Sequence, residues 1–404
     1  MPSLCKYLFL ISPFVLQLTG AAPTEKHVSS SGSFRIEQVA KQRSTARNGL
    51  AAYAKALRKY AHHANNTDEI MSQAAALVDA SSVVTTPVQG DALYITPVTI
   101  GSQTFDLDID TGSSDLWVLG NTLPQRSGFT YYAPGSTARR QSGETWDITF
   151  ADGSGASGIV YTDTVTVGGS TVTGQVVEFA NAVSGFNQAG DAEDGIFGLA
   201  FDSINTVTPT QAQTFFSTAV DQGLPLALFT ALLKRGEPGA YTFGEIDTTQ
   251  FTGDITYTPI DSSQGFWTFS PDGLTIGTTT FSVPDGLLTG IADTGTTLLL
   301  VMDNIAATYY ARVSGAQFSN AVGAYIFPCS ANLPDFTVDI NGYSATVPGE
   351  FINFGVLTGN TCIGGIQSAS GLPFNIYGDI FLKSQFVVFD RTQATPRIGF
   401  ANQA

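Results

Sequence analysis

A short motif in which aspartate is followed by threonine and glycine occurs twice in the chain, at residues 110–112 and 293–295. Two carboxylates held close together cannot both stay ionised, so such a pair shares one proton and its two apparent pKa values separate. The ionised partner can take a proton from water while the protonated partner polarises a carbonyl group. If folding brings Asp110 and Asp293 together, the sequence predicts hydrolysis by a bridging water at acidic pH, without a metal ion or cofactor.

The residues that follow each aspartate are of types suited to holding a carboxyl group. Glycine lets the backbone approach closely and offers an N–H donor. The next residue carries a hydroxyl that can donate to the outer carboxyl oxygen, and the threonine could bond across to the other copy. The expected supporting residues are Thr111, Gly112, Ser113, Thr294, Gly295 and Thr296.

Both motifs lie within a longer internal repeat. Residues 110–118 read DTGSSDLWV and residues 293–301 read DTGTTLLLV, and each is followed by an apolar-apolar-glycine element, at 196–198 and 376–378. A single Asp-Thr-Gly suits any turn, but two copies at equivalent points indicate a body of two similar halves. An axis between the halves could bring the two aspartates face to face.

Composition restricts the chemistry further. Residues 81–404 hold nine Lys and Arg against 29 Asp and Glu, a net charge of −20, which argues against binding to nucleic acid or to anionic membranes. All three histidines (His27, His62 and His63) precede residue 81. If that front part is removed, the remaining body cannot use Ser-His-Asp or Cys-His catalysis or His-ligated zinc.

The first 80 residues are typical of two removable segments. Residues 1–21 carry Lys6, a short apolar stretch and small residues at their end, as a secretory signal peptide does. Residues 22–80 have a net charge of +3, and residues 49–63 within them have helical periodicity. A basic segment ahead of an acidic body predicts a pro-segment that docks by charge and is later removed. A disordered linker is the alternative.

After residue 81 the pattern is that of a β protein with many tight turns, since this part holds 39 of the 42 glycines. Runs rich in Val, Ile, Thr and Phe predict strands at 94–100, 145–150, 159–167, 171–179 and 386–389. Helices are expected at 208–223 and, with a possible Asp303 cap, at 303–314.

The three cysteines permit at most one internal bridge in the body. Cys5 falls in the signal segment, so Cys329 and Cys362 remain. A secretory context favours their oxidation, and two free thiols are the alternative.

Several stretches together resemble the pepsin-type aspartic proteases, and in particular the fungal secreted branch that includes penicillopepsin and aspergillopepsin. Besides the second DTG motif, they are DTGSSDLW at 110–117, DGIFGLAF at 194–201, YGDIFL at 377–382 and YITPVTIG at 94–101. The resemblance covers residues 81–404. It implies a mainly β fold of two pseudo-twofold lobes, at 81–255 and 256–404, around a central cleft for an extended peptide. It also implies a Cys329–Cys362 disulfide in the second lobe.

The family's β-hairpin flap corresponds to residues 146–155. Members usually carry Tyr where this chain has Phe150, which lacks the hydroxyl that would bond the Trp117 indole, so we expect activity with altered flap motion. Asp152 either lets Lys be accepted beside the cut, as in some fungal members, or only makes the turn. The flap and cleft residues that the resemblance implies are Trp117, Phe150, Ala151, Asp152, Gly153, Ile196 and Thr297.

The pair Lys59-Tyr60 resembles the pro-segment pair whose lysine occupies the catalytic carboxylates in zymogens of this family. A lysine there would form charge-assisted hydrogen bonds with both aspartates and keep water out. Acidification protonates the carboxylates and weakens the attraction, so self-activation at low pH is our hypothesis.

Two further residues each keep two interpretations. Asp108 lies two residues before Asp110, so on a strand both side chains point the same way. It could raise the pKa of the catalytic pair, or it could be structural. Trp267 could line the cleft or pack in the core.

The sequence thus predicts a secreted, monomeric acid endopeptidase that is sensitive to pepstatin. Its partners would be protein and peptide substrates, with bulky apolar residues on both sides of the cut, and its own pro-segment.

Three other classes of protein stay open: an inactive peptide-binding relative, an acid glycosidase, which also uses paired carboxylates, and a β-rich cell-wall protein. The intact aspartates argue against the first, the duplicated turn against the second and the pro-segment against the third.

Overall fold

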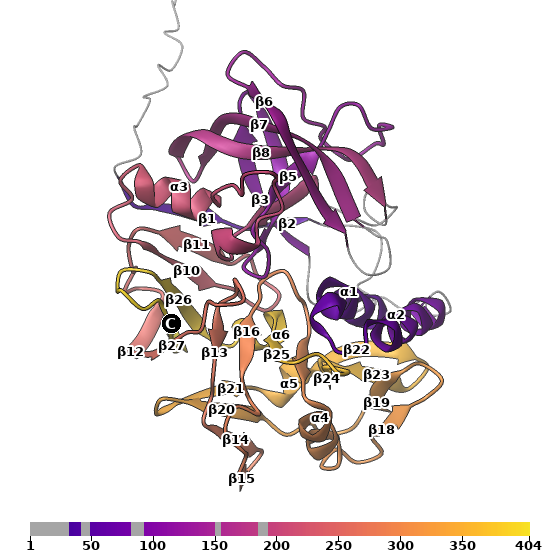
Figure 1. The fold of residues 1–404 in the computed structure, drawn as a ribbon. Coiled ribbons are helices and arrows are strands. Elements are labelled where there is room, and N and C mark those ends of the chain that lie inside the picture. The colour runs from indigo at the N-terminus through magenta and orange to yellow at the C-terminus, as the bar shows by residue number, and fades with distance from the viewer. Residues whose placement is uncertain (1–31, 42–48, 82–92, 150–154, 185–192) are drawn as a thin grey trace, which may run out of the picture.

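The computed structural model describes residues 32–41, 49–81, 93–149, 155–184 and 193–404. Strands dominate these residues and form five sheets, arranged as two lobes with a shared sheet between them (Figure 1). The expectation of a mainly β, bilobed fold is therefore confirmed. The predicted signal segment and the predicted flap residues Phe150, Ala151, Asp152 and Gly153 lie outside the described residues.

The first lobe is built on an eight-stranded sheet that curls back on itself, because β3 pairs with β7 as well as with its neighbours. In sheet order its strands are β2 (Val39–Lys41), β3 (Leu93–Ile100), β4 (Gln103–Asp110), β9 (Gly195–Gly198), β5 (Leu116–Leu119), β8 (Ser170–Ser184), β7 (Gly155–Val167) and β6 (Arg139–Thr149). Along β4, buried Phe105, Leu107 and Ile109 alternate with more exposed residues. The two-residue period of a strand therefore separates a core face from the face that carries Asp108 and Asp110.

The second lobe contains three smaller sheets. One consists of β13 (Thr268–Phe269), β16 (Gly290–Ala292), β25 (Asn375–Tyr377), β17 (Leu299–Val301) and β24 (Ile366–Ser368). Another consists of β15 (Thr279–Phe281), β14 (Gly273–Ile276), β20 (Phe336–Ile340) and β21 (Tyr343–Val347). The last consists of β18 (Gln317–Ser319), β19 (Ala324–Pro328), β23 (Thr361–Gly364) and β22 (Asn353–Thr358).

A six-stranded sheet joins the lobes and takes strands from three distant parts of the chain (Figure 1). Its order is β1 (Phe34–Glu37), β11 (Ala240–Phe243), β10 (Leu228–Leu232), β26 (Phe386–Asp390), β27 (Arg397–Gln403) and β12 (Phe251–Pro259). The edge strand β1 comes from the predicted pro-segment and pairs Phe34 with Phe243. The predicted lobe boundary at residue 255 falls inside β12, and the domain bounds stay predictions.

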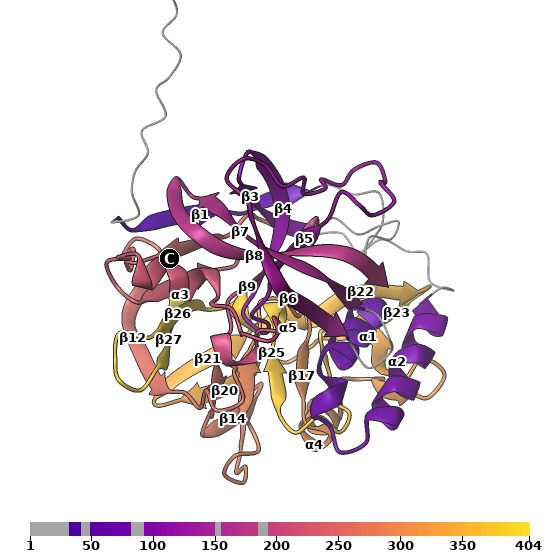
Figure 2. The same ribbon diagram turned by 45° about the horizontal axis from the view of Figure 1, so that its top comes forward.

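The two longest of the described helices come from the predicted pro-segment and pack against each other, and the first of them also packs against β22 and β23 (Figure 2). The helices are α1 (Gly49–Tyr60), α2 (Thr67–Ser81), α3 (Phe215–Asp221), α4 (Asp303–Tyr310), α5 (Gly349–Ile352) and α6 (Asp379–Leu382), with short 3₁₀ turns η1 (Ala61–His63) and η2 (Asp202–Ile204). Leu50, Tyr53 and Leu57 on α1 are fully buried, so the predicted amphipathic helix docks by its apolar face. Among the helices in the described ranges, none is both long and apolar enough to cross a bilayer.

Two helix expectations were wrong in detail. The helix expected over 208–223 begins only at Phe215, because Thr208 instead exchanges backbone hydrogen bonds with Thr145. Thr214 caps the shorter helix by accepting from the Ser217 N–H at 3.2 Å. Asp303 is the first residue of α4 rather than its cap, and its carboxyl accepts a hydrogen bond from Ser368.

Trp267 packs in the core between the lobes. Its side chain is 1 % exposed, and its ring lies 5.9 Å from the Phe229 ring and 5.1 Å from the Phe389 ring. Its indole N–H donates to the carbonyl of Leu199 at 3.0 Å. These contacts favour the packing interpretation over a cleft-lining one.

Candidate active site

A strand leads into each Asp-Thr-Gly motif. The parallel strand beside it carries the apolar-apolar-glycine element of the same half of the repeat. β4 ends at Asp110 and runs parallel to β9, while β16 ends just before Asp293 and runs parallel to β25. A Cβ on Gly198 would lie 2.6 Å from a backbone nitrogen of the first aspartate loop, and one on Gly378 would lie 2.3 Å from a backbone oxygen of the second. Only glycine fits such close backbone crossings, which explains why the element ends in glycine in both halves.

The two aspartate loops are tied together by a symmetrical set of hydrogen bonds through Thr111 and Thr294. Each threonine hydroxyl accepts from the other threonine's backbone N–H, at 3.0 Å in both directions. Each also donates across the axis to the carbonyl before the opposite aspartate, Thr111 to Ala292 at 2.8 Å and Thr294 to Ile109 at 2.7 Å. Four buried bonds therefore fix the relative position of the loops.

Each aspartate carboxyl is held by two donors from its own loop. Asp110 accepts a backbone N–H at Oδ1 (2.8 Å) and a hydroxyl at Oδ2 (2.6 Å). Asp293 accepts a backbone N–H at Oδ1 (2.9 Å) and a hydroxyl at Oδ2. In chain order these donors belong to Gly112, Ser113, Gly295 and Thr296.

The two carboxyl groups face each other across the axis. A Cβ on Gly112 would lie 2.5 Å from Asp293 Oδ1, and a Cβ on Gly295 would lie 2.3 Å from Asp110 Oδ1. Each carboxyl thus reaches the glycine of the opposite loop, where any larger residue would displace it. The glycine after each threonine is therefore needed for the two aspartates to approach.

Lys59, at the end of α1, lies between the two aspartates. Its Nζ donates to Asp110 Oδ1 at 2.8 Å and to Asp293 Oδ1 and Oδ2 at 3.1 and 3.2 Å. The next residue, Tyr60, donates its hydroxyl to Asp293 Oδ2 at 2.6 Å. The side chains of Asp110 and Asp293 are only 3 % and 0 % exposed, so this segment covers both carboxyls.

Lys59 makes the two carboxyls electrostatically unequal. Burial works to raise the pKa of Asp110, but the Lys59 ammonium and its hydrogen bond outweigh burial and lower that pKa to about 2. Burial prevails at Asp293, where it raises the pKa with help from the charge of Asp110 and against that of Lys59. Burial also disfavours the charged form of Lys59, yet the two carboxylates raise its pKa above the usual value.

A second lysine of α1, which the sequence reasoning missed, lies near a second pair of acids. Lys55 Nζ is 3.9 Å from Glu193 Oε1, and its charge also acts on Asp108. Burial raises the pKa of Asp108 to about 8, and nearby Lys55 only partly offsets this. The missed signal was spacing: Lys55 and Lys59 are four residues apart on a helix, so they share a face, as Asp108 and Asp110 do on β4.

The described residues expected in the cleft lie on neighbouring strands or loops. Trp117 and Ile196 pair across β5 and β9, and the buried Trp117 ring stacks on the Trp146 ring at 6.0 Å. Thr297 is half-buried in the second aspartate loop, and its carbonyl accepts from the Ile380 N–H at 3.0 Å. Trp117 is only 2 % exposed, so its side chain is buried rather than lining a surface.

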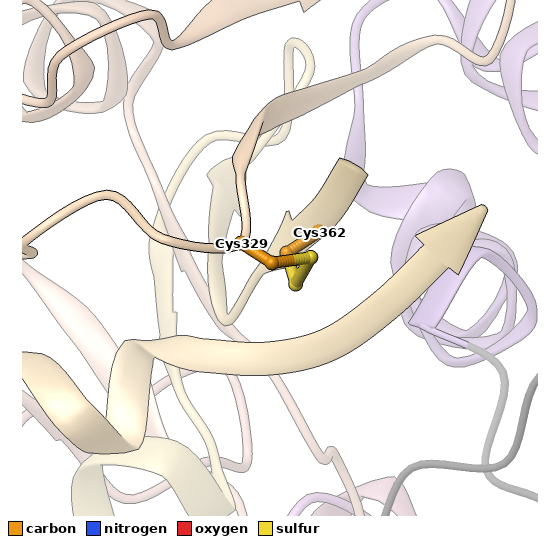
Figure 3. Close-up of a disulfide and its surroundings, with 2 residues drawn as sticks. All are labelled: Cys329 and Cys362. Atoms are coloured by element: carbon orange, nitrogen blue, oxygen red, sulfur yellow. A yellow bond between two sulfur atoms is a disulfide. The ribbon is translucent and has the colours of Figure 1, made fainter. Parts of the chain in front are cut away.

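Cys329 and Cys362 are joined by a disulfide in the second lobe (Figure 3). The bond links the end of β19 to β23. These strands are also neighbours in the sheet, where Phe327 of β19 pairs with Cys362 of β23. It therefore reinforces the sheet against which α1 packs.

Comparison with known proteins agrees with this geometry. The family model for eukaryotic aspartyl proteases matches residues 93–403. The chain is 49 % identical to aspergillopepsin-1 of Aspergillus oryzae, over 95 % of each chain. It is 54 % identical to penicillopepsin-1 of Penicillium janthinellum, over 80 % of this chain and 100 % of the relative. The crystal structure of an aspartic proteinase from Irpex lacteus superposes with a TM-score of 0.64 at 27 % identity, covering 77 % of this chain and 94 % of the other. The chain therefore belongs to the eukaryotic aspartyl protease family and is an aspartic endopeptidase.

Proposed function

We propose that this protease is made as a secreted, self-inhibited precursor and that, once residues 1–80 are removed, it cleaves peptide bonds at acidic pH with a water held between Asp110 and Asp293. The observation that carries the proposal is the position of Lys59 Nζ, within hydrogen-bonding distance of both carboxyls. A group bound there blocks the point from which a water could contact both aspartates. The same point becomes open to solvent when α1 leaves.

Without the Lys59 ammonium, two buried carboxyls face each other and share one proton. The ionised carboxyl takes a proton from the bridging water as its oxygen attacks the scissile carbonyl carbon, while the protonated carboxyl donates to the carbonyl oxygen. The C–N bond of the tetrahedral intermediate then breaks as the leaving amine takes a proton from one carboxyl and a hydroxyl of the intermediate returns a proton to the other, so that the pair again holds one proton. The outer carboxyl oxygens are engaged by Ser113 and Thr296, which leaves the inner oxygens for this chemistry.

The acidic working range follows from the proton that the pair must keep. As pH rises above the higher of the two apparent pKa values, both carboxyls ionise and no acid remains to polarise the carbonyl. Activity should therefore fall on the alkaline side.

The surroundings of Tyr60 support a preference for bulky apolar residues beside the cut. Its ring lies 5.8 Å from the Phe266 ring and 5.7 Å from the Phe374 ring, both edge-on. Since Tyr60 directly follows the residue that occupies the aspartates, an aromatic side chain of a substrate would find the same contacts. We also propose that the enzyme is a pepstatin-sensitive monomer.

Casein digestion at pH 3–4, with and without pepstatin, by protein from which an added, pepstatin-insensitive protease has removed the pro-segment tests the proposal. Asp110→Asn and Asp293→Asn should each lower activity about 10³-fold or more, since each removes half of the acid–base pair. Asp254→Asn, which changes an exposed acid of β12, is the matched control. Substantial digestion by either active-site variant would contradict the assignment.

A further inference from the structure

Asp115 and Glu178 form a second carboxyl pair, buried in the first lobe and unused by the proposed chemistry. Both side chains are 1 % exposed. Asp115 directly precedes β5, and Glu178 lies on β8 in register with Trp117 of β5. The Asn205 amide nitrogen donates to both carboxyls, at 3.2 Å to Asp115 Oδ1 and at 2.9 Å to Glu178 Oε1, so the two carboxyls lie next to each other. Because two adjacent carboxyls buried from water cannot both stay ionised, one of them is expected to hold a proton.

The donors around the pair reach one oxygen of each carboxyl, Asp115 Oδ1 and Glu178 Oε1. Asp115 Oδ1 accepts from the Thr206 N–H and hydroxyl, both at 2.8 Å, and from the Asn205 amide at 3.2 Å. Glu178 Oε1 accepts from the same Asn205 amide at 2.9 Å. Glu178 Oε2 is buried and receives no donor from the described residues. A proton held between the carboxyls supplies the missing donor.

Within the described part of the chain, neither carboxyl is paired with a Lys, Arg or His side chain. Of the elements around the pair, β5 and β9 carry no ionisable residue, β7 carries Tyr161 and Asp163, and η2 carries Asp202. The further charge that acts on Asp115 is that of Asp110, another acid. A second negative charge on the pair would therefore be buried without compensation, which is costly.

We propose that Asp115 and Glu178 share one proton throughout the acidic working range, that this proton holds the Asp110 loop in place, and that its loss sets the upper pH limit of the active fold.

The connection to Asp110 runs through backbone hydrogen bonds. The Gly198 N–H donates to the Asp115 carbonyl at 3.0 Å, and the next residue, Leu199, donates to the Asp110 carbonyl at 2.7 Å. The Asn205 amide that bridges the two carboxyls also contacts the Ser114 carbonyl at 3.3 Å. Repulsion between two charged carboxylates would push apart β8 and the loop that carries Asp115, and this loop begins at Asp110. Asp115 and Glu178 are thus positioning residues.

The direction of the pH effect follows from burial. Burial raises the pKa of Asp115, and burial together with the charge of Asp115 holds the pKa of Glu178 well above its usual range. An acid whose pKa is raised by folding stabilises the fold fully below its unfolded pKa, about 4 for Asp and Glu, and loses that contribution as pH rises through the folded pKa. Stability should therefore decline from about pH 4 toward neutrality.

Glu178→Gln is the informative variant, because its amide oxygen can still accept from Asn205 and its NH₂ group can donate to Asp115 without a titrating proton. We expect the half-life of the activated enzyme at pH 7 to lengthen about tenfold, the effect of one pKa unit. The ratio of its activity at pH 7 to that at pH 4 should rise in parallel. Asp115→Asn should act in the same direction, whereas Asp254→Asn removes an exposed charge and should change neither quantity.

If Glu178→Gln and Asp115→Asn both lose activity at pH 7 as fast as the unmodified enzyme does, the proposal is overturned. Infrared spectroscopy of unmodified protein labelled with ¹³C at glutamate carboxyls does not depend on a variant folding. It should show a protonated glutamic acid persisting at pH 6.5, and its absence would equally reject a shared proton. The link from the carboxyl pair to Asp110 rests on the proposed function. The effect of the pair on stability does not, and it can be measured separately as the unfolding temperature from pH 3.5 to 8. If Asp110→Asn left activity intact, the unfolding temperatures would still test whether the pair shares a proton.

Discussion

The Lys59 ammonium lies 2.8 Å from Asp110 Oδ1, although the two residues are 51 positions apart in the chain. The contact is charge-assisted, nearly excluded from solvent and duplicated at Asp293. It converts a site that could activate water into one filled by the protein's own side chain. Helix α1 holds it there through an apolar face that acid does not weaken directly.

Removing the Lys59 charge should activate the proposed precursor. Lys59→Met keeps an unbranched side chain but loses hydrogen bonds to charged partners, each worth about 1.5–3 kcal/mol. We expect precursor activity on a short peptide at pH 5 to rise about tenfold or more before any chain cleavage, as followed by mass spectrometry. Lys234→Met, at a side chain 38 % exposed, is the control. Unchanged activity in Lys59→Met would show that other contacts close the cleft.

Lys55 should matter much less than Lys59. Its side chain is 54 % exposed and its closest ion-pair distance, to Glu193, is 3.9 Å. Exposed pairs of this kind contribute up to about 1 kcal/mol. Lys55→Met should therefore speed acid activation by no more than about fivefold, measured as loss of precursor on gels. An effect equal to that of Lys59→Met would mean that Asp108 and Glu193 hold the pro-segment more strongly than the geometry indicates.

His63 should help to make pro-segment release acid-dependent. Its ring packs 5.3 Å from the Phe266 ring and 5.7 Å from the Phe374 ring, and burial, with the His62 charge, lowers its pKa to about 4. The ordinary histidine pKa is about 6.5. Neutral His63 therefore supports docking above pH 6.5, and that support is lost as pH falls toward 4.

We expect His63→Phe, which keeps the aromatic packing but cannot be protonated, to shift the activation midpoint to lower pH. The measurement is the fraction of precursor processed after a fixed time across pH 3–7. His27→Gln is the control for removal of a pro-segment histidine. An unshifted midpoint in His63→Phe would assign the pH dependence to the carboxylates alone.

The bonds between Thr111 and Thr294 should be needed for both stability and activity. Thr111→Val is close to isosteric, but it leaves the Thr294 N–H and the Ala292 carbonyl buried without their partner, at about 1–3 kcal/mol for each unsatisfied group. We expect a lower unfolding temperature at pH 4 and a fall in kcat that exceeds any change in KM. Thr104→Val, at an exposed threonine of β4, should leave both unchanged. Equal behaviour of the two variants would argue against a positioning role for the cross-axis bonds.

The sequence by itself determined the family, the mainly β fold and the pairing of two equivalent aspartate loops. These follow from local patterns: residue types at short spacing, the two-residue period of strands and a repeat that predicts symmetry. The helix near residue 208 was placed too early, because the bridge between Thr208 and Thr145 joins residues whose proximity no local pattern encodes.

Only the tertiary structure revealed which charged groups meet outside the two Asp-Thr-Gly loops. Asp115 and Glu178 are unremarkable in the sequence and become a proton-sharing pair because β5 and β8 run side by side in the first lobe. Asp108 gains a pKa of about 8 from burial, which the sequence could not reveal. The physical reason is that desolvation and Coulomb interactions depend on which segments exclude water from one another, and distant strands and helices make that decision together.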